Sequence, residues 1–234
     1  MKIIAILTGK DKSSFRNKNK IKILNRYIFN YSVIEAKKVS KIEKFYTSSD
    51  SRLILNETKK NGFESIKRPK NLSTKNSKHV EVIKHALKTI NKNNIFPEII
   101  VILLANAPII KAKWINDCIN LIARNRKITA VVPVKHYNDH HPERAKKIKG
   151  FFLDNFIKGK KISSNRQDLT DCYFLCHNFW VIKTKEIFKN NGLMPWSFMG
   201  KKVKPYVIKN SIDIHDNLDV EIAKILIKND KYIR

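Results

Sequence analysis

Residues 98–105, which read EIIVILLA, decide the fold of this chain. The apolar residues stand at consecutive positions, and β-branched side chains are frequent among them. A strand of this kind is buried on both faces, which is typical of a central strand in a parallel sheet. A second apolar run of strand length, KIIAILT, occupies residues 2–8. We therefore expect both runs to lie in the interior of an α/β domain.

Strand-like and helix-like segments alternate around this run. The expected strands cover residues 45–48, 64–67 and 130–134. The expected helices cover residues 27–41, 51–61 and 77–90, with another around Trp114 and Cys118. Alternation of this kind predicts an open, mainly parallel sheet sandwiched by helices on both sides. We expect residues 1–234 to form a single domain of this α/β class.

The alternation breaks after Val134. Residues 135–170 form an excursion between two expected core strands, with a hairpin or loose arm at residues 150–159. Such excursions are usual locations for subunit contacts or lids. A long strand is then expected at residues 173–182 (YFLCHNFWVI), and an edge strand at residues 203–208.

The last expected helix follows from SIDIHDNLDVEIAKILI at residues 211–227. Asn217 is the expected cap, and Asp219 and Glu221 fall in the first turn, where acidic side chains match the helix dipole. The expected apolar face of this helix consists of Leu218, Ile222, Ile225 and Leu226.

The net charge of +28, from 48 basic and 20 acidic residues, points to anionic partners. The lysines are spread along the whole chain without a basic tail or an aromatic RNA-binding motif. We therefore do not expect a nucleic acid as the specific partner. Non-specific attraction to polyanions and small anionic substrates both remain compatible with this charge.

The longest apolar run, residues 99–105, is far shorter than the roughly 20 residues of a membrane helix. The start of the chain has no secretory signal pattern. We expect a soluble, cytoplasmic protein with no membrane partner. The three cysteines, Cys118, Cys172 and Cys176, lack metal-type spacing and fit reduced thiols in a core.

Four polar loops follow predicted strands, at residues 9–19, 49–50, 68–79 and 106–108. Ligands of open α/β sheets bind beyond the carboxyl ends of the strands. The first loop, KDKSSFRNKNK at residues 10–20, is rich in cations and hydroxyl groups, which is typical of an anion site. It matches neither GxxxxGK[ST] nor GxGxxG. The alternative is an exposed basic loop without a ligand.

An acidic cluster lies near the other end of the chain, where Asp213, Asp216 and Asp219 flank His215. Helix capping explains Asp219 and is an alternative for Asp216, but it leaves Asp213 unexplained. A Mg²⁺ ion held by one or two carboxylates and by substrate phosphates would explain Asp213. Together with Lys10 and Lys18, the cluster fits a metal-bound nucleoside triphosphate.

The histidines of the chain say less about the chemistry of the site than its acidic and basic residues do. His140 and His141 fit either ligands or an exposed pair, and His177 lies among apolar residues, where a core histidine is the commoner case. No Ser-His-Asp or Cys-His motif is present, so we do not expect covalent catalysis.

Six short motifs follow one another along the chain. They are Lys18-Asn19 with Lys10 upstream, SSD at 48–50, RPKNLS at 68–73, LLANAP at 103–108, RQDLT at 166–170 and IDIHDNLDV at 212–220. In this order the chain resembles the CMP-sialic acid synthetases, the N-acylneuraminate cytidylyltransferase family, over almost its full length. The resemblance implies a nucleotide-diphospho-sugar-transferase-like fold and a homodimer joined through the excursion after Val134. It also implies Mg²⁺-dependent transfer of CMP from CTP to the anomeric hydroxyl of a nonulosonic acid, with release of pyrophosphate.

The resemblance also implies roles for particular residues. Lys18 and Asp213 would be catalytic. The nucleotide would be bound by Lys10, Ser13, Lys18, Asn19, Arg68, Ser77 and His79. The sugar acid would be bound by Asn106, Arg166, Gln167 and His177, and the metal by Asp213 with His215 or Asp216.

The chain departs from the family pattern at several points. The opening loop lacks the family's Arg-Gly-Gly. Where the family has its second metal-binding aspartate this chain has His215, and where the family has an Asn-Gly pair it has His177-Asn178. The acceptors left open are sialic, legionaminic, pseudaminic and deoxyoctulosonic acids, or a phosphonate. The alternative from another class is a polyanion- or RNA-binding scaffold on a degenerate transferase fold.

Overall fold

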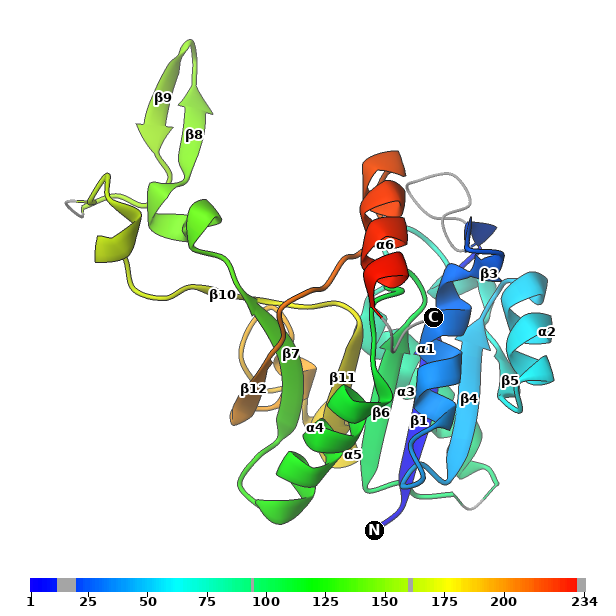
Figure 1. The fold of residues 1–234 in the computed structure, drawn as a ribbon. Coiled ribbons are helices and arrows are strands. Elements are labelled where there is room, and N and C mark those ends of the chain that lie inside the picture. Colours follow the sequence, from blue (N-terminus) through cyan, green and yellow to red (C-terminus); the bar gives the residue numbers. More distant parts are fainter. Residues whose placement is uncertain (12–19, 94, 160–161, 231–234) are drawn as a thin grey trace.

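The computed structural model describes residues 1–11, 20–93, 95–159 and 162–230. Its centre is an eight-stranded sheet in the order β10-β7-β11-β6-β1-β4-β5, with β12 paired to β7 (Figure 1). The middle strand β6 (Ile99–Leu104) runs parallel to β1 (Ile3–Thr8). Next to β1 follow β4 (Lys44–Ser49) and β5 (Glu64–Lys67), both in parallel. The central parallel strand predicted from EIIVILLA is confirmed.

The other half of the sheet contains β7 (Ala130–His136), β11 (Phe179–Lys183) and β12 (Val203–Val207). Strand β11 is antiparallel to both β6 and β7, whereas β12 is parallel to β7 and lies at the edge. The sheet is therefore mainly parallel with an edge strand near residues 203–208, as predicted.

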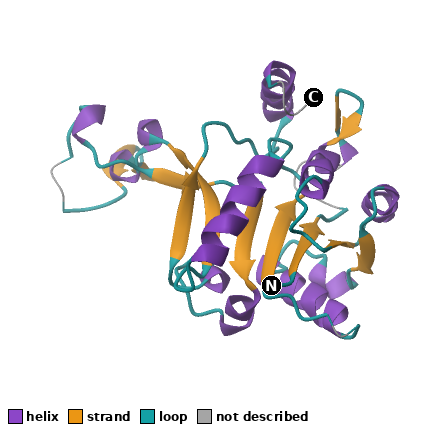
Figure 2. Cartoon of the chain, turned by 60° about the horizontal axis from the view of Figure 1, so that its bottom comes forward, coloured by secondary structure: helices purple, strands orange, loops and turns teal. Residues whose placement is uncertain are grey.

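Helices cover both faces of the sheet, as Figure 2 shows. One face packs against α1 (Ile28–Lys37), α2 (Arg52–Lys60) and α4 (Ala112–Arg124). The other packs against α3 (His79–Asn91), α5 (Thr184–Lys189) and the short turn η6 (Ser197–Met199). Successive residues of β1 alternate between the two cores, because side chains of a strand point to opposite faces. The predicted three-layer α/β class is confirmed.

The predicted long strand at residues 173–182 is wrong. It is divided into β10 (Tyr173–Leu175) and β11, and the register against β7 shifts by three residues between them. The physical reason is the end of β6 at Leu104, beyond which the strand has β7 alone as a neighbour. The break is held by Trp180, whose Nε1 donates to the Cys176 carbonyl at 3.1 Å. His177 lies within this break.

The last helix, α6 (Asn217–Asn229), differs from the prediction in two ways. Its cap is Asp216, not Asn217, and Asp216 and Asp219 form a capping box. Its buried face consists of Val220, Ala223 and Ile227. Of the predicted apolar face, Leu218, Ile222 and Ile225 lie on the opposite side and are exposed, whereas Leu226 is partly buried against the core of this helix.

The reason for this rotation is tertiary. The Ile214 amide donates to the Asn106 carbonyl at 3.0 Å, which sets the direction in which the chain enters α6. The helix then packs on a separate small core that includes Ile23, Ile28 and Tyr31. Ile23 belongs to the hairpin of β2 (Lys22–Ile23) and β3 (Arg26–Tyr27).

The excursion after β7 is an arm that extends away from the sheet (Figure 1). It carries the hairpin of β8 (Lys146–Lys149) and β9 (Phe152–Asn155), which starts earlier than predicted. Short turns flank the hairpin, namely η3 (Asn138–His140), η4 (Pro142–Arg144) and η5 (Arg166–Asp168). No helix among the described residues has the length and apolar character to cross a membrane.

Candidate functional site

The carboxyl ends of β1, β4, β5 and β6 meet at one edge of the sheet, at the upper side of the body in Figure 1. A cavity of about 240 Å³ lies there. Its lining comes from three of the four loops predicted to form a site, and includes Lys10, Arg68, Ser77, His79 and Asn106. All five are residues to which the sequence assigns a binding role.

Gly9 allows the floor of this cavity to close. A Cβ atom at this position would lie 2.9 Å from Ala105 Cβ and 3.1 Å from Ile54 Cδ1. The ends of β1 and β6 therefore approach each other more closely than any side chain at position 9 permits.

His79 opens α3 and reaches back to β1. Its Nε2 lies 3.0 Å from the Thr8 hydroxyl, and its ring lies 5.5 Å from the ring of Trp180. Burial lowers the pKa of His79, and together with the charges of Arg68 and His177 it brings the value to about 4. The imidazole is therefore neutral at pH 7, with one nitrogen that donates and one that accepts.

Arg68 and Ser77 shape the far wall. Arg68 is buried, and its Nη2 donates to the Ser48 carbonyl at 2.8 Å. Ser77 Oγ donates to the Asn71 carbonyl at 3.0 Å and accepts from the Thr74 amide at 3.1 Å, which closes the turn before α3. Ser77 is thus a loop-stabilising residue at the rim of the cavity.

Asp213 reaches the same edge from the other end of the chain. The Asn106 side-chain amide donates to Asp213 Oδ1, and His215 Nε2 lies 3.1 Å from Asp213 Oδ2. Since Asn106 also lines the cavity, this contact connects the acidic cluster to the cavity. The sequence predicted that Asp213 and the cationic opening segment belong to one site. It did not predict that Asn106 connects Asp213 to the cavity.

The other acidic residues are engaged in the start of α6. Asp216 Oδ1 accepts from the Asp219 amide at 2.9 Å, and Asp219 Oδ2 accepts from the His215 and Asp216 amides at 2.7 and 3.2 Å. Among the described residues, no group of three His, Cys, Asp or Glu side chains is arranged to hold a metal ion. A metal here would depend on Asp213 and on oxygens from outside the protein.

His177 lies between two indole rings, with ring centroids 5.6 Å from Trp180 and 5.4 Å from Trp196. Burial lowers its pKa, while the nearby Asp213 carboxylate opposes this shift. The side chain is thus an aromatic-packed histidine close to the acidic cluster. His177 is therefore compatible with both predictions made for it, a histidine packed in the core and a residue of the site.

Arg166 and Gln167 lie elsewhere. They belong to η5 on the arm and line a separate cavity of about 550 Å³, together with His136 and Asp171. Arg166 Nη1 pairs with Asp139 Oδ1 at 2.7 Å. Within one chain, the structure does not bring Arg166 and Gln167 together with Asn106 and His177. The expected four-residue sugar pocket is therefore divided between the body and the arm.

Ser13, Lys18 and Asn19 lie outside the described residues. Two residues that the sequence did not single out as ligands contact Asp11, the described residue at the start of their loop. The Asp50 carboxylate accepts from the Asp11 amide at 2.9 Å, and Ser51 Oγ donates to Asp11 Oδ1 at 3.0 Å. Asp50 is the last residue of the SSD motif and could therefore be noticed in the sequence. Its contact with Asp11 depends on the approach of β1 to β4, which the sequence does not display.

The sheet order, with a cavity beyond the carboxyl ends of its parallel strands, is that of a ligand-binding open α/β protein. The chain belongs to the cytidylyltransferase family, whose sequence model matches residues 11–193. It is 24% identical over 229 residues to the N-acylneuraminate cytidylyltransferase of Escherichia coli O18:K1:H7. This match covers 95% of the chain but 51% of the relative, so the chain spans about half the length of that protein. The predicted resemblance is confirmed.

Solved structures support the fold. A CMP:2-keto-3-deoxy-manno-octonic acid synthetase complexed with CTP aligns with a TM-score of 0.69 at 9% identity, covering 97% of this chain and 99% of the other. A 4-diphosphocytidyl-2C-methyl-D-erythritol synthase from Anaerococcus prevotii aligns with a TM-score of 0.67 at 15% identity, covering 97% and 96%. At these identities the likeness shows the nucleotide-diphospho-sugar-transferase fold and no more.

Proposed function

We propose that this protein transfers CMP from CTP to the anomeric hydroxyl of a nonulosonic, sialic-type sugar acid and releases pyrophosphate. One observation carries the proposal, namely the contact of Asn106 with Asp213 at the edge of the cavity that Lys10 and His79 line. This contact joins a cationic and an acidic half into one site, as a metal-bound triphosphate requires.

In this reaction the chain acts mainly by positioning and by neutralising charge. Lys10 and His79 line the cavity, where Lys10 would meet the triphosphate and the neutral His79 would offer a hydrogen bond to the nucleoside. The sugar hydroxyl attacks the α-phosphorus, and the bond to the leaving pyrophosphate breaks. His177, beside Asp213 and against Trp196, is placed to contact the sugar acid.

Asp213 offers a carboxylate oxygen, the kind of ligand that Mg²⁺ takes in proteins. The Asn106 amide and the His215 imidazole lie beside this carboxylate. Mg²⁺ is commonly held by one or two protein carboxylates together with substrate phosphates and water. Asp213 would hold the ion, with His215, Asp216 or water completing its surroundings, and the ion would neutralise phosphate charge.

We propose a sialic-type acceptor because the matched relative is named for N-acylneuraminate. A deoxyoctulosonic acid is the second candidate, since the named substrate of a solved structure with the same fold is of that kind. Both acids present a carboxylate beside the reacting hydroxyl. A panel of such acids therefore has to accompany any assay.

We also propose a homodimer joined through the arm, located in the cytoplasm. The hairpin exposes a group of large apolar side chains, Ile148, Phe151, Phe152, Leu153 and Phe156. Exposed patches of this kind mark interaction sites. A second copy would cover them and would bring Arg166 and Gln167 near the Asn106 side of its partner.

Pyrophosphate release from CTP tests the reaction. We expect release only with Mg²⁺ and a nonulosonic acid, and a loss of at least about 100-fold in kcat/KM for Asp213→Asn. Glu57→Gln is the matched control, because it also neutralises one carboxylate but lies on α2. No release with any acid in the panel, combined with unchanged CTP binding in Asp213→Asn, would refute the proposal. Salt-sensitive RNA binding in that case would favour the polyanion alternative.

A further inference from the structure

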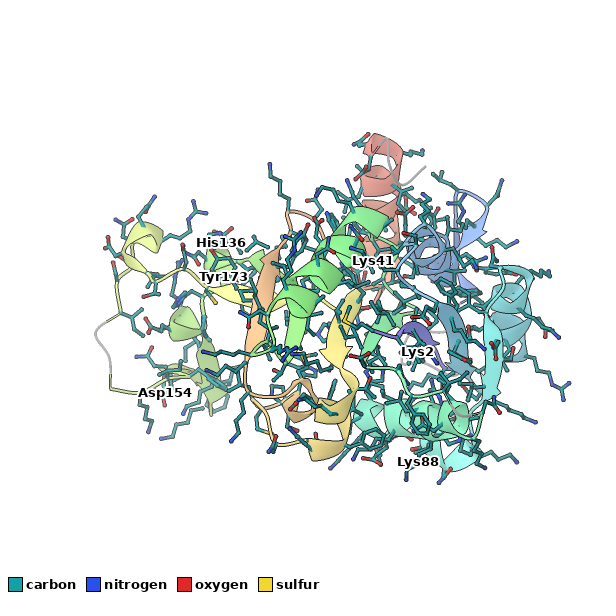
Figure 3. The ribbon with its side chains drawn as sticks, turned by 90° about the horizontal axis from the view of Figure 1, so that it is seen from below. Lys2, Lys41, Lys88, His136, Asp154 and Tyr173 are labelled. Carbon is teal, nitrogen blue, oxygen red and sulfur yellow. The ribbon has the colours of Figure 1, made fainter. Side chains whose placement is uncertain are left out.

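A second cavity lies at the opposite end of the sheet from the nucleotide cavity. It has a volume of about 610 Å³ and is bordered by the start of β6, the end of β11 and the last turns of α3 and α4. Figure 3 views the molecule from this side, with Lys2 near the middle of the view. The proposed reaction uses none of the residues that line this cavity.

The walls of the cavity are apolar. Phe96, Ile122 and Phe188 contribute to them, and the two phenylalanine side chains remain 66% and 45% exposed. Isolated exposed apolar residues need no explanation, but two aromatic rings bordering one hollow form a patch that favours a ligand. The volume falls within the usual range of small-molecule sites, which is about 300–1,000 Å³.

The mouth of the cavity is cationic. Arg126, Lys183 and Lys185 line it, and Lys183 Nζ donates to the Arg126 carbonyl at 2.7 Å. Burial lowers the pKa of Lys183, as do the positive charges of Lys185 and Arg126, whereas the Glu186 carboxylate raises it. The lining acid Glu98 is already engaged by the Lys2 amide at 3.3 Å and by the Met1 amine at 3.6 Å.

A hydroxyl group completes this polar rim. Thr184, another lining residue, has a buried Oγ1 without a hydrogen-bond partner among the described residues. Buried polar atoms usually have a partner, and a hydroxyl can donate to a carboxylate. Apolar walls with a cationic, hydrogen-bond-donating mouth are complementary to a molecule with an apolar body and one acidic head.

We infer that this cavity is a binding site for a free amphiphilic carboxylate, whose apolar body packs on Phe96 and Phe188 and whose head lies between Lys183 and Lys185. The cationic mouth favours a negatively charged ligand over a neutral one in this apolar cavity. A neutral apolar ligand would offer no charge complementary to the cationic mouth.

Isothermal titration with decanoate tests this site, and decanol serves as the uncharged probe of the same length. We expect one decanoate per chain, and about tenfold weaker binding in Lys185→Gln. Phe188→Ser should weaken both probes by about tenfold, because both use the apolar wall. Lys59→Gln, a lysine-to-glutamine change on the distant helix α2, is the matched control and should bind decanoate normally.

Two results would overturn the inference. The first is absence of decanoate binding at millimolar concentration by a protein whose thermal unfolding is normal. The second is binding that Lys59→Gln weakens as much as Lys185→Gln, or decanol binding as tight as that of decanoate, since either shows that the mouth does not select the charge. Binding of CTP is measured separately, so failure of this site leaves the proposed reaction untouched.

Discussion

At the residue scale, His79 combines a buried imidazole with a contact to the last residue of β1. Its pKa of about 4 in the folded protein lies below that of an unfolded histidine, about 6.5. The unfolded state therefore binds more protons between these values. Stability attributable to His79 is intact above pH 6.5 and falls as the pH decreases toward 4.

We predict that this residue makes the protein less stable at pH 5 than at pH 7.5. The wild type should lose about 1–2 kcal/mol more than His79→Gln over this interval, as measured by urea unfolding at both pH values. His140→Gln is the control, since His140 is exposed on η3. Equal losses in wild type and His79→Gln would show that the imidazole is not held neutral.

Gly9 gives a prediction about close packing. Gly9→Ala should destabilise the protein by about 1–3 kcal/mol, because the new methyl group meets Ala105 Cβ at 2.9 Å. The double variant Gly9→Ala, Ala105→Gly removes that contact and should recover part of the loss in a thermal unfolding experiment. No recovery would mean that the strain arises at Ile54 or in the backbone.

Several binding residues were predicted from features that can be read directly from the sequence. Lys10, Arg68, Ser77 and His79 lie in polar loops after strands, and the structure places them around one cavity. The link between Asn106 and Asp213 was not predictable, because a hydrogen bond across 107 positions depends on where two loops meet.

At the element scale, α6 shows how a sequence can contain two apolar stripes. Val220, Ala223 and Ile227 lie on one side, and Leu218, Ile222 and Ile225 lie on the other. Helical periodicity identifies both stripes but does not say which one meets the core. The choice was made by the chain entering from Ile214, so of the four predicted residues only Leu226 packs against the core.

The start of α6 provides a direct test. Asp216→Ala should lower the stability by about 1 kcal/mol, because it removes the acceptor for the Asp219 amide. In a chain of this size that corresponds to a decrease of about 2–4 °C in Tm. Asn217→Ala is the matched control and should change the Tm little, since Asn217 is the first helical residue rather than the cap. The opposite order of effects would favour Asn217 as the cap.

At the scale of the whole molecule, the arm separates residues that the sequence grouped together. Arg166 and Gln167 lie on the arm, whereas Asn106 and Asp213 lie on the body. Figure 3 shows the arm beside the body, with His136, Tyr173 and Asp154 toward the arm and Lys41 and Lys88 on the body. The proposed dimer accounts for the separation if each site takes its arm residues from the partner.

Mixing two inactive variants tests that arrangement. Arg166→Ala and Asp213→Ala, unfolded together and refolded as a mixture, should recover about a quarter of the wild-type activity, because half of the dimers would be mixed and each would contain one intact site. Sedimentation of the mixture measures the dimer. Dimers without recovered activity would place Arg166 and Asp213 in the same chain's site, and monomers would refute the dimer.

The sequence alone determined the class of the fold, because strand and helix periodicities are local properties and the consecutive apolar residues of 98–105 require burial on both faces. It also predicted four loops at the site, three of which line the cavity, since parallel strands place their carboxyl ends at one edge. Only the tertiary structure decided the break at His177, the orientation of α6 and the separation of Arg166 from Asn106. Each of these depends on contacts between distant segments, and the energies of such contacts are absent from any local pattern.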